Sequence, residues 1–157
     1  MAETKIDMKK SDLMPSKSAI ELFEKMLKEN QLCVLATSSK NGKPEAATIK
    51  YAEDKDSNLF FETLSINRKY QNIQENPIGS IVITEIPNSI QMDGILKELI
   101  GKDAMNAKEI LIKKNGKVPS FFDDPNIKFF KFIPNWIRLR TKIDGSHLPK
   151  YEMILEK

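Results

Sequence analysis

The spacing of apolar residues changes near position 31 of the chain. Over residues 18–30 they recur every three or four positions, as at Ile20 and Phe23, which predicts an amphipathic helix. Residues 32–37 (LCVLAT) form a short apolar run of the kind found in buried strands. Residues 1–14, which mix both charge signs, are expected to be a flexible lead-in. A helix therefore precedes a β-rich region.

Turn signals divide this β-rich region into hairpins. Asn41-Gly42 is the residue pair most typical of a two-residue hairpin turn. The polar run over residues 54–58 is a second turn. We therefore predict strands over residues 45–53 and 59–63, each following one of the two turns.

A second helix is predicted after these strands. Ser65 has the hydroxyl of a helix N-cap, and Pro77 blocks further helix, so the helix is expected over residues 65–76. Ile66 is expected on its buried stripe, followed by Tyr70 and Ile73 at helical spacing.

The second half of the chain repeats this alternation. Residues 79–86 and 89–99 are predicted strands, and a glycine inside the second of them, Gly94, indicates a bulge or a close approach of other atoms. Asp103 is the expected cap of a third helix that ends at Asn115-Gly116. A long strand over 127–143 follows a loop rich in proline and aspartate.

The order of elements predicts the fold class. Strands joined by hairpins, rather than strands that alternate with helices, favour an antiparallel sheet closed into a small barrel with helices outside. We predict a mainly β, α+β protein with six antiparallel strands and one domain over residues 15–143. Residues 144–157 are predicted to be a C-terminal tail that adds a short strand.

Composition removes several kinds of chemistry. The 157-residue chain is 40% hydrophobic and 30% charged, as folded domains are. Its single cysteine, Cys33, and single histidine, His147, form neither a disulfide nor a Cys/His zinc site within one chain. A net charge of +3, no leader-like N-terminus and no long apolar run indicate a cytoplasmic protein that binds neither membrane nor nucleic acid. The reactive group is therefore expected to come from a cofactor.

The segment FETLSINRK carries the strongest chemical signal. Arg68 and Lys69 fall in the first turn of the predicted helix, where the helix dipole disfavours cations unless an anion binds there. Thr63 and Ser65 add hydroxyl donors. This combination suits a phosphate group. A solvated basic patch beside an ordinary serine cap is the alternative.

Further candidates lie on the predicted strands. Thr48 and Lys50 share a strand face with alanines, which leaves room for a flat ligand, although a solvent-facing strand explains the same pattern. Trp136 and Arg138 share another face, where the tryptophan stacks on a ligand ring or anchors a core or interface. The remaining single candidates are Glu62, a possible acid or base, and Gln91.

The predicted strands and helices, taken in the order in which they follow one another along the chain, resemble the pyridoxamine 5'-phosphate oxidase-like family of FMN-binding split barrels. The most specific element is the pattern Thr-x-Ser-x-x-Arg-Lys followed by Asn-Pro, over residues 63–77. The strand IQMDGIL, with its internal glycine, and the segment FFKFIPNWIRL are the further matches. The resemblance covers about residues 32–140.

The resemblance implies a six-stranded antiparallel split barrel that forms a homodimer, with FMN bound at the subunit interface. Arg68 and Lys69 would grip the FMN phosphate, and Gln91 would reach the flavin from the partner subunit. The implied cofactor-binding residues are Thr48, Ile49, Lys50, Glu62, Thr63, Ser65, Arg68, Lys69, Gln91, Trp136 and Arg138.

The function implied is that of an FMN-dependent oxidoreductase that passes a hydride from a reduced nicotinamide through FMN to a small acceptor. Oxidation of pyridoxamine 5'-phosphate is not expected, because the single histidine, His147, lies in the tail rather than on a late strand. The alternatives are a non-catalytic flavin-binding, storage or redox-sensing module, a deazaflavin or haem in place of FMN, and a small nucleic-acid binder that uses the helix with Arg68.

Overall fold

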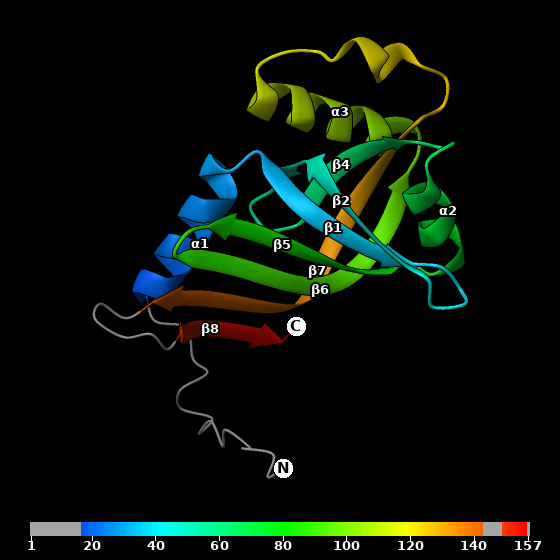
Figure 1. The fold of residues 1–157 in the computed structure, drawn as a ribbon. Helices are drawn as coiled ribbons and strands as arrows, with labels where there is room; N and C mark the ends of the chain where they lie inside the picture. The colour runs from blue at the N-terminus through cyan, green and yellow to red at the C-terminus, as the bar shows by residue number, and fades with distance from the viewer. Residues whose placement is uncertain (1–16, 143–148, 157) are drawn as a thin grey trace.

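The computed structural model describes residues 17–142 and 149–156, where one curved antiparallel sheet carries three α-helices (Figure 1). The strands are β1 (Leu32–Ser38), β2 (Pro44–Lys50), β3 (Ala52–Glu53), β4 (Leu59–Leu64), β5 (Ile78–Glu85), β6 (Asn88–Leu99), β7 (Ile127–Lys142) and β8 (Pro149–Glu156). The helices are α1 (Lys17–Glu29), α2 (Arg68–Glu75), α3 (Gly101–Asn115) and the 3₁₀ turn η2 (Ser120–Asp123). The predicted lead-in over 1–14 and His147 lie outside the described residues.

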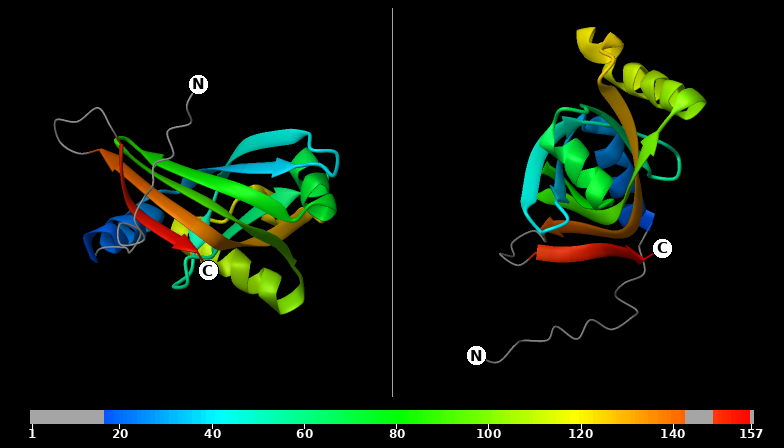
Figure 2. Two further views of the ribbon diagram at one scale, coloured as in Figure 1. Left: turned by 90° about the horizontal axis from the view of Figure 1, so that it is seen from below. Right: turned by 90° about the vertical axis from the view of Figure 1, so that its right-hand side faces the viewer.

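The sheet curls into a barrel with a slit in it. Its strand order is β2-β1-β5-β6-β7-β4-β3, and β8 pairs with β7 off this path. The end strands β2 and β3 are neighbours in the chain, so the sheet returns to its starting point, as the right-hand view of Figure 2 shows. Among the described residues β2 forms no ladder with β4, and the barrel is split there. The predicted split-barrel class is confirmed.

Tyr51 explains why the structure has more strands than predicted. The sequence predicts one strand over residues 45–53, but Tyr51 separates β2 from β3. Its N–H donates to the carbonyl of Gln31 (3.1 Å) and its hydroxyl to the carbonyl of Leu27 (2.8 Å). Tyr51 and Ala52 are both buried, which breaks the alternation of a simple strand. This division and the predicted tail strand, β8, bring the described sheet to eight strands.

Two hydrophobic cores hold the fold together. The main core fills the barrel, where Phe61 and Phe130 stack with ring centroids 5.4 Å apart and Phe23 of α1 closes one end. The second core lies outside the barrel, between α3 and the strands β4 and β7, where Phe122 packs edge-to-face on Phe129. Figure 2 shows α3 beside the barrel. No helix among the described residues is long and apolar enough to cross a membrane.

The helix starts differ from the prediction. The second helix begins at Arg68 after Asn67, so Ser65 is not its cap, because residues 64–67 form a turn in which the N–H of Asn67 donates to the carbonyl of Leu64. Ile66 in this turn is 72% exposed rather than buried. Asp103 lies in the first turn of α3 rather than at its cap, because the helix begins at Gly101.

The prediction for Gly94 is confirmed. The register between β6 and β7 shifts at Asp93 and Gly94, which marks a bulge. A Cβ at Gly94 would lie 2.3 Å from the carbonyl oxygen of Ile133 and 2.8 Å from the Phe132 ring. Only glycine allows β7 to approach β6 this closely.

Candidate functional site

A groove of about 300 Å³ opens where β2 and β4 separate. It is lined by Thr48, Ile49, Lys50, Glu62, Thr63, Leu64, Asn67, Lys69, Phe121 and Ile127. The predicted site residues that it brings together are Thr48, Ile49, Lys50, Glu62, Thr63 and Lys69. Because β2 and β4 are distant in the sheet order, the closure of the barrel creates this site.

One end of the groove is the start of α2. Asn67 occupies the N-cap position, but its side chain makes no capping hydrogen bond. Its amide nitrogen instead donates to the hydroxyl of Thr63 (3.1 Å), so this side chain caps no N–H group of the first turn, although the N–H of Tyr70 donates to the Asn67 carbonyl (3.1 Å). Lys69, the second residue of the helix, adds a positive charge to the groove wall. This end of the groove is therefore suited to an anion.

Arg68 and Ser65 do not line the groove in this structure. The Nε of Arg68 lies 2.6 Å from a carboxylate oxygen of Glu45, and the arginine side chain is 57% exposed. The N–H of Ser65 donates to the carbonyl of Asn126, which ties the β4–α2 turn to the loop before β7 (2.9 Å).

Glu62 lies on β4 with an unused acceptor. Its Oε2 is buried and has no hydrogen-bond partner among the described residues. Burial raises the pKa of this carboxyl, and its own backbone N–H and the charge of Lys50 oppose the rise. A buried acceptor left without a donor costs stability.

The other predicted residues form a separate cluster on β6 and β7. An Nη of Arg138 donates to the side-chain oxygen of Gln91. The guanidinium carbon of Arg138 also lies 5.5 Å from the ring centroid of Trp136. The three side chains thus come together, but away from the groove at β2 and β4.

The sheet register gives the relation between the two groups. Thr48 pairs with Val34, Val34 with Val82, Val82 with Gln91 and Gln91 with Arg138, so these residues form one row across five strands. Three strand spacings separate Thr48 from Gln91, which corresponds to about 14 Å. Within one protomer, Thr48 and Gln91 are therefore too far apart to contact the same atom of a ligand.

Sequence reasoning missed part of the groove wall. Asn67 stands inside the recognised segment, where its proximity to Arg68 was the available signal. Phe121 belongs to η2, a turn that folds back over β4 although it lies far along the chain. Its proline- and aspartate-rich sequence indicated only a loop.

Several solved structures share this fold. One is a Listeria innocua protein assigned provisionally as a pyridoxamine 5'-phosphate oxidase (19% identity, TM-score 0.64, 76% of this chain and 95% of that chain). Another is a heme binding protein from Mycobacterium smegmatis (15%, TM-score 0.67, 88% and 58%). A third is an F420 reductase (18%, TM-score 0.60, 73% and 94%).

The lengths of these relatives differ from that of this chain. The chain spans 58% of the mycobacterial protein and 57% of Atu2129, a protein of unknown function from Agrobacterium tumefaciens that has the same fold (15% identity, TM-score 0.71, 79% of this chain).

No curated protein sequence matches the chain. A sequence model described as Pyridoxamine 5'-phosphate oxidase matches residues 19–140, which include both groups of candidate residues. The chain therefore belongs to the pyridoxamine 5'-phosphate oxidase family.

Proposed function

We propose that this protein binds FMN in the groove between β2 and β4 and uses it as a redox cofactor. The observation that carries the proposal is the anion-binding end of the groove. There the first turn of α2 has no side-chain cap from Asn67, and Lys69 lines the wall. Family membership supports the same assignment.

The chemistry of the groove fits the parts of FMN. Lys69 and the first-turn N–H groups of α2 would hold the phosphate, because they combine a point charge with preformed donors. The exposed strand residues Thr48 and Lys50 would flank the flat ring, whereas the Ile49 side chain between them is buried in the barrel core. The ligand would lie along β2 with its phosphate at α2.

FMN supplies hydride-transfer chemistry when it is bound, and the protein residues bind and orient it. We propose a reduced nicotinamide as the hydride donor and a small molecule as the acceptor. Lys50 stands beside Glu62 in the groove wall, where its charge opposes the raised pKa of that carboxyl. A cation at this position would favour negative charge on the bound ring.

The proposal includes a homodimer. Leu32, Val34 and Val82 are 53%, 40% and 37% exposed on the outer face of the sheet. They lie between Thr48 and Gln91, beside or within the same row of residues. A second copy docked on this face would cover the apolar residues and carry its own Gln91 toward the groove.

A non-catalytic flavin-binding module is the alternative of a different class. Haem is less well supported, although a neighbouring structure is a heme binding protein. The lining of the groove, all of it within the described residues, includes no His, Cys, Met or Tyr, the usual axial ligands of haem iron.

The test is the spectrum of the purified protein and the identity of any chromophore it releases. A yellow protein that releases FMN, or a colourless one that takes up FMN stoichiometrically, is expected. No uptake on titration would overturn the proposal. Bleaching of the bound flavin by NADH or NADPH, followed by turnover of an acceptor, separates the oxidoreductase from the binding module. Light scattering at several protein concentrations tests the dimer.

A further inference from the structure

An ion pair crosses the slit of the barrel at the end where α2 begins. The Nε of Arg68, the first residue of α2, donates to a carboxylate oxygen of Glu45 on β2 (2.6 Å). Because α2 follows β4 in the chain, the two residues come from opposite sides of the slit. The Glu45 side chain is only 11% exposed, whereas that of Arg68 is 57% exposed. The pair therefore holds the arginine and leaves much of its side chain in water.

The position of α2 does not depend on this ion pair. The Nδ2 of Asn72 donates to the hydroxyl of Thr37 (3.1 Å), and both residues are buried. The Nδ2 of Asn76, just after the helix, donates to the hydroxyl of Ser38 (2.9 Å). Both contacts join α2 to β1, the strand beside β2. If the charge of Glu45 is removed, the helix is expected to stay in place while the arginine side chain becomes free to move.

The start of α2 keeps two backbone donors for an anion. The N–H groups of Arg68 and Lys69 have no acceptor within the described part of the chain, whereas the N–H of Tyr70 donates to the carbonyl of Asn67. Side chains of a helix lean toward its N-terminus, so an arginine released by Glu45 would extend toward an anion bound there. A guanidinium binds phosphate through several N–H groups in a fixed fork. Arg68 is thus next to the proposed phosphate position but held outside the groove.

We propose that Glu45 limits the affinity for FMN by keeping Arg68 away from the phosphate, an inference that rests on the proposed function. In the wild type, Lys69 and the two N–H groups hold the phosphate while Arg68 stays with Glu45. When the charge of Glu45 is removed, the guanidinium turns to the phosphate and adds charge-assisted hydrogen bonds. Glu45 thereby determines how strongly the site distinguishes FMN from riboflavin, which has no phosphate.

The burial of Glu45 explains why this carboxylate competes with the phosphate. At 11% exposure it has lost most of its contact with water, so it would be left without a charged partner if Arg68 moved. Breaking such a pair costs more than breaking a pair that is fully solvated. The cost opposes what the arginine would gain from the phosphate. Glu45→Gln removes the cost, because a neutral amide needs no cation.

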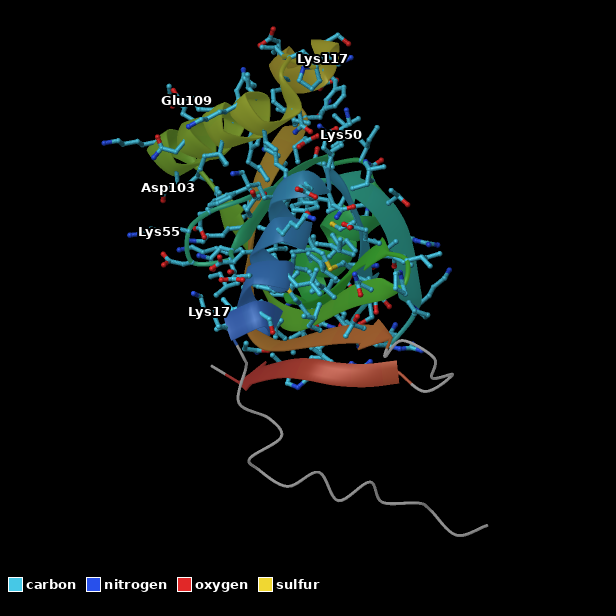
Figure 3. The ribbon with its side chains drawn as sticks, turned by 90° about the vertical axis from the view of Figure 1, so that its left-hand side faces the viewer. Lys17, Lys50, Lys55, Asp103, Glu109 and Lys117 are labelled. Carbon is cyan, nitrogen blue, oxygen red and sulfur yellow. The ribbon has the colours of Figure 1, made fainter. Side chains whose placement is uncertain are left out.

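The test compares the binding of FMN and of riboflavin to the full chain in four forms. They are the wild type, Glu45→Gln, Arg68→Ala and the double variant that combines both changes. Quenching of flavin fluorescence gives the dissociation constants. Because Glu45→Gln also removes a negative charge near the phosphate, the double variant separates the arginine from this general effect. Glu109→Gln removes the same charge from an exposed position of α3, at the outside of the molecule (Figure 3), and is the second control.

Glu45→Gln is expected to bind FMN about fivefold more tightly than the wild type does, the contribution of about one hydrogen bond, and to bind riboflavin with unchanged affinity. The gain should disappear in the double variant, and Glu109→Gln should match the wild type. Glu45→Ala should show the same gain, and it decides the question if Glu45→Gln folds poorly.

Two results would overturn the inference and leave the proposed function intact. One is a wild type that binds FMN while removal of the Glu45 charge gives no gain. The other is a gain that persists in the double variant, because it would not depend on Arg68. Failure of every form to bind FMN would overturn the proposed function and this inference with it.

Discussion

Arg68 is held by Glu45, with 2.6 Å between Nε and a carboxylate oxygen, whereas the adjacent Lys69 lines the groove. The two cations are therefore not equivalent. Lys69→Ala should reduce FMN affinity about tenfold or more, since a charge-assisted hydrogen bond contributes about 1.5–3 kcal/mol. Arg68→Ala should have the smaller effect on FMN affinity, because Arg68 pairs with Glu45 and does not line the groove. Titrations of FMN and of riboflavin, which lacks the phosphate, make the comparison.

Riboflavin affinity should be nearly the same in Lys69→Ala and in the wild type. An equal loss for riboflavin and FMN would contradict the assignment of Lys69 to the phosphate. A larger loss in Arg68→Ala would mean that the arginine leaves Glu45 when FMN binds.

The stability of the protein should depend on pH through Glu62. Burial raises its pKa above the ordinary 4.5, so the folded chain holds this proton more tightly than the unfolded chain does. The ionised carboxylate therefore costs stability above the folded pKa, and the cost disappears as the pH falls below the unfolded value. Glu62→Gln should raise the free energy of unfolding at pH 8, and the gain should vanish near pH 4. Urea titrations at both pH values, with Glu109→Gln as control, measure this; a gain independent of pH would contradict it.

Lys114 is the polar link between α3, α1 and β3. Its ammonium pairs with Glu53, donates to the carbonyl of Leu27 (2.7 Å) and lies 4.0 Å from the centroid of the Tyr51 ring. Only 12% of the side chain is exposed. Lys114→Ala leaves Glu53 without this partner and should cost about 3 kcal/mol of unfolding free energy. The exposed neighbour Lys113, changed to Ala, should cost less than about 0.5 kcal/mol. Chemical denaturation compares them, and equal effects would refute the link.

Gly94→Ala should destabilise the protein by about 2–3 kcal/mol, because the new methyl group meets the backbone of Ile133. Gly79→Ala is a graded control, since its nearest contact is the flexible end of the Leu96 side chain, at 2.7 Å. Thermal unfolding should therefore show the larger loss for Gly94→Ala. The reverse order would contradict the close approach of β6 and β7.

The thiol of Cys33 should be unreactive toward thiol reagents in the folded protein. It is 3% exposed, and burial raises the pKa of its thiol to about 12, against the opposing charge of Lys114. A thiol reagent at pH 8 should therefore label it only after unfolding, when one thiol per chain becomes reactive. Absorbance at increasing denaturant concentration follows the labelling. Rapid, complete labelling of the native protein would contradict the burial.

The sequence predicted the parts of the fold that local patterns determine. Helix periodicity, the Asn41-Gly42 turn and the internal Gly94 were sufficient for most elements, because each depends on neighbours in the chain. The break at Tyr51 was missed because its cause is a tertiary contact: the hydroxyl bonds to Leu27, on a different element. No local rule reports a partner 24 positions away.

The residues of the candidate site also divide into those that local sequence patterns predicted and those that depend on tertiary packing. The TLSINRK segment supplied Thr63 and Lys69, since resemblance and helix electrostatics both point to it. Phe121 was missed, because it reaches the site only through the folding of η2 over β4. Gln91 and Arg138 pair with each other on β6 and β7, outside the lining of the groove.

The chain closes its barrel covalently, through Tyr51, instead of by a last row of ladder hydrogen bonds. Side chains along the slit between β2 and β4 can therefore be exchanged without removing a strand pairing. Substitutions along the slit can therefore change which ligand fits there while the hydrophobic core of the barrel is unchanged. The slit, where we propose that the cofactor binds, is thus the place where a relative would change its chemistry first.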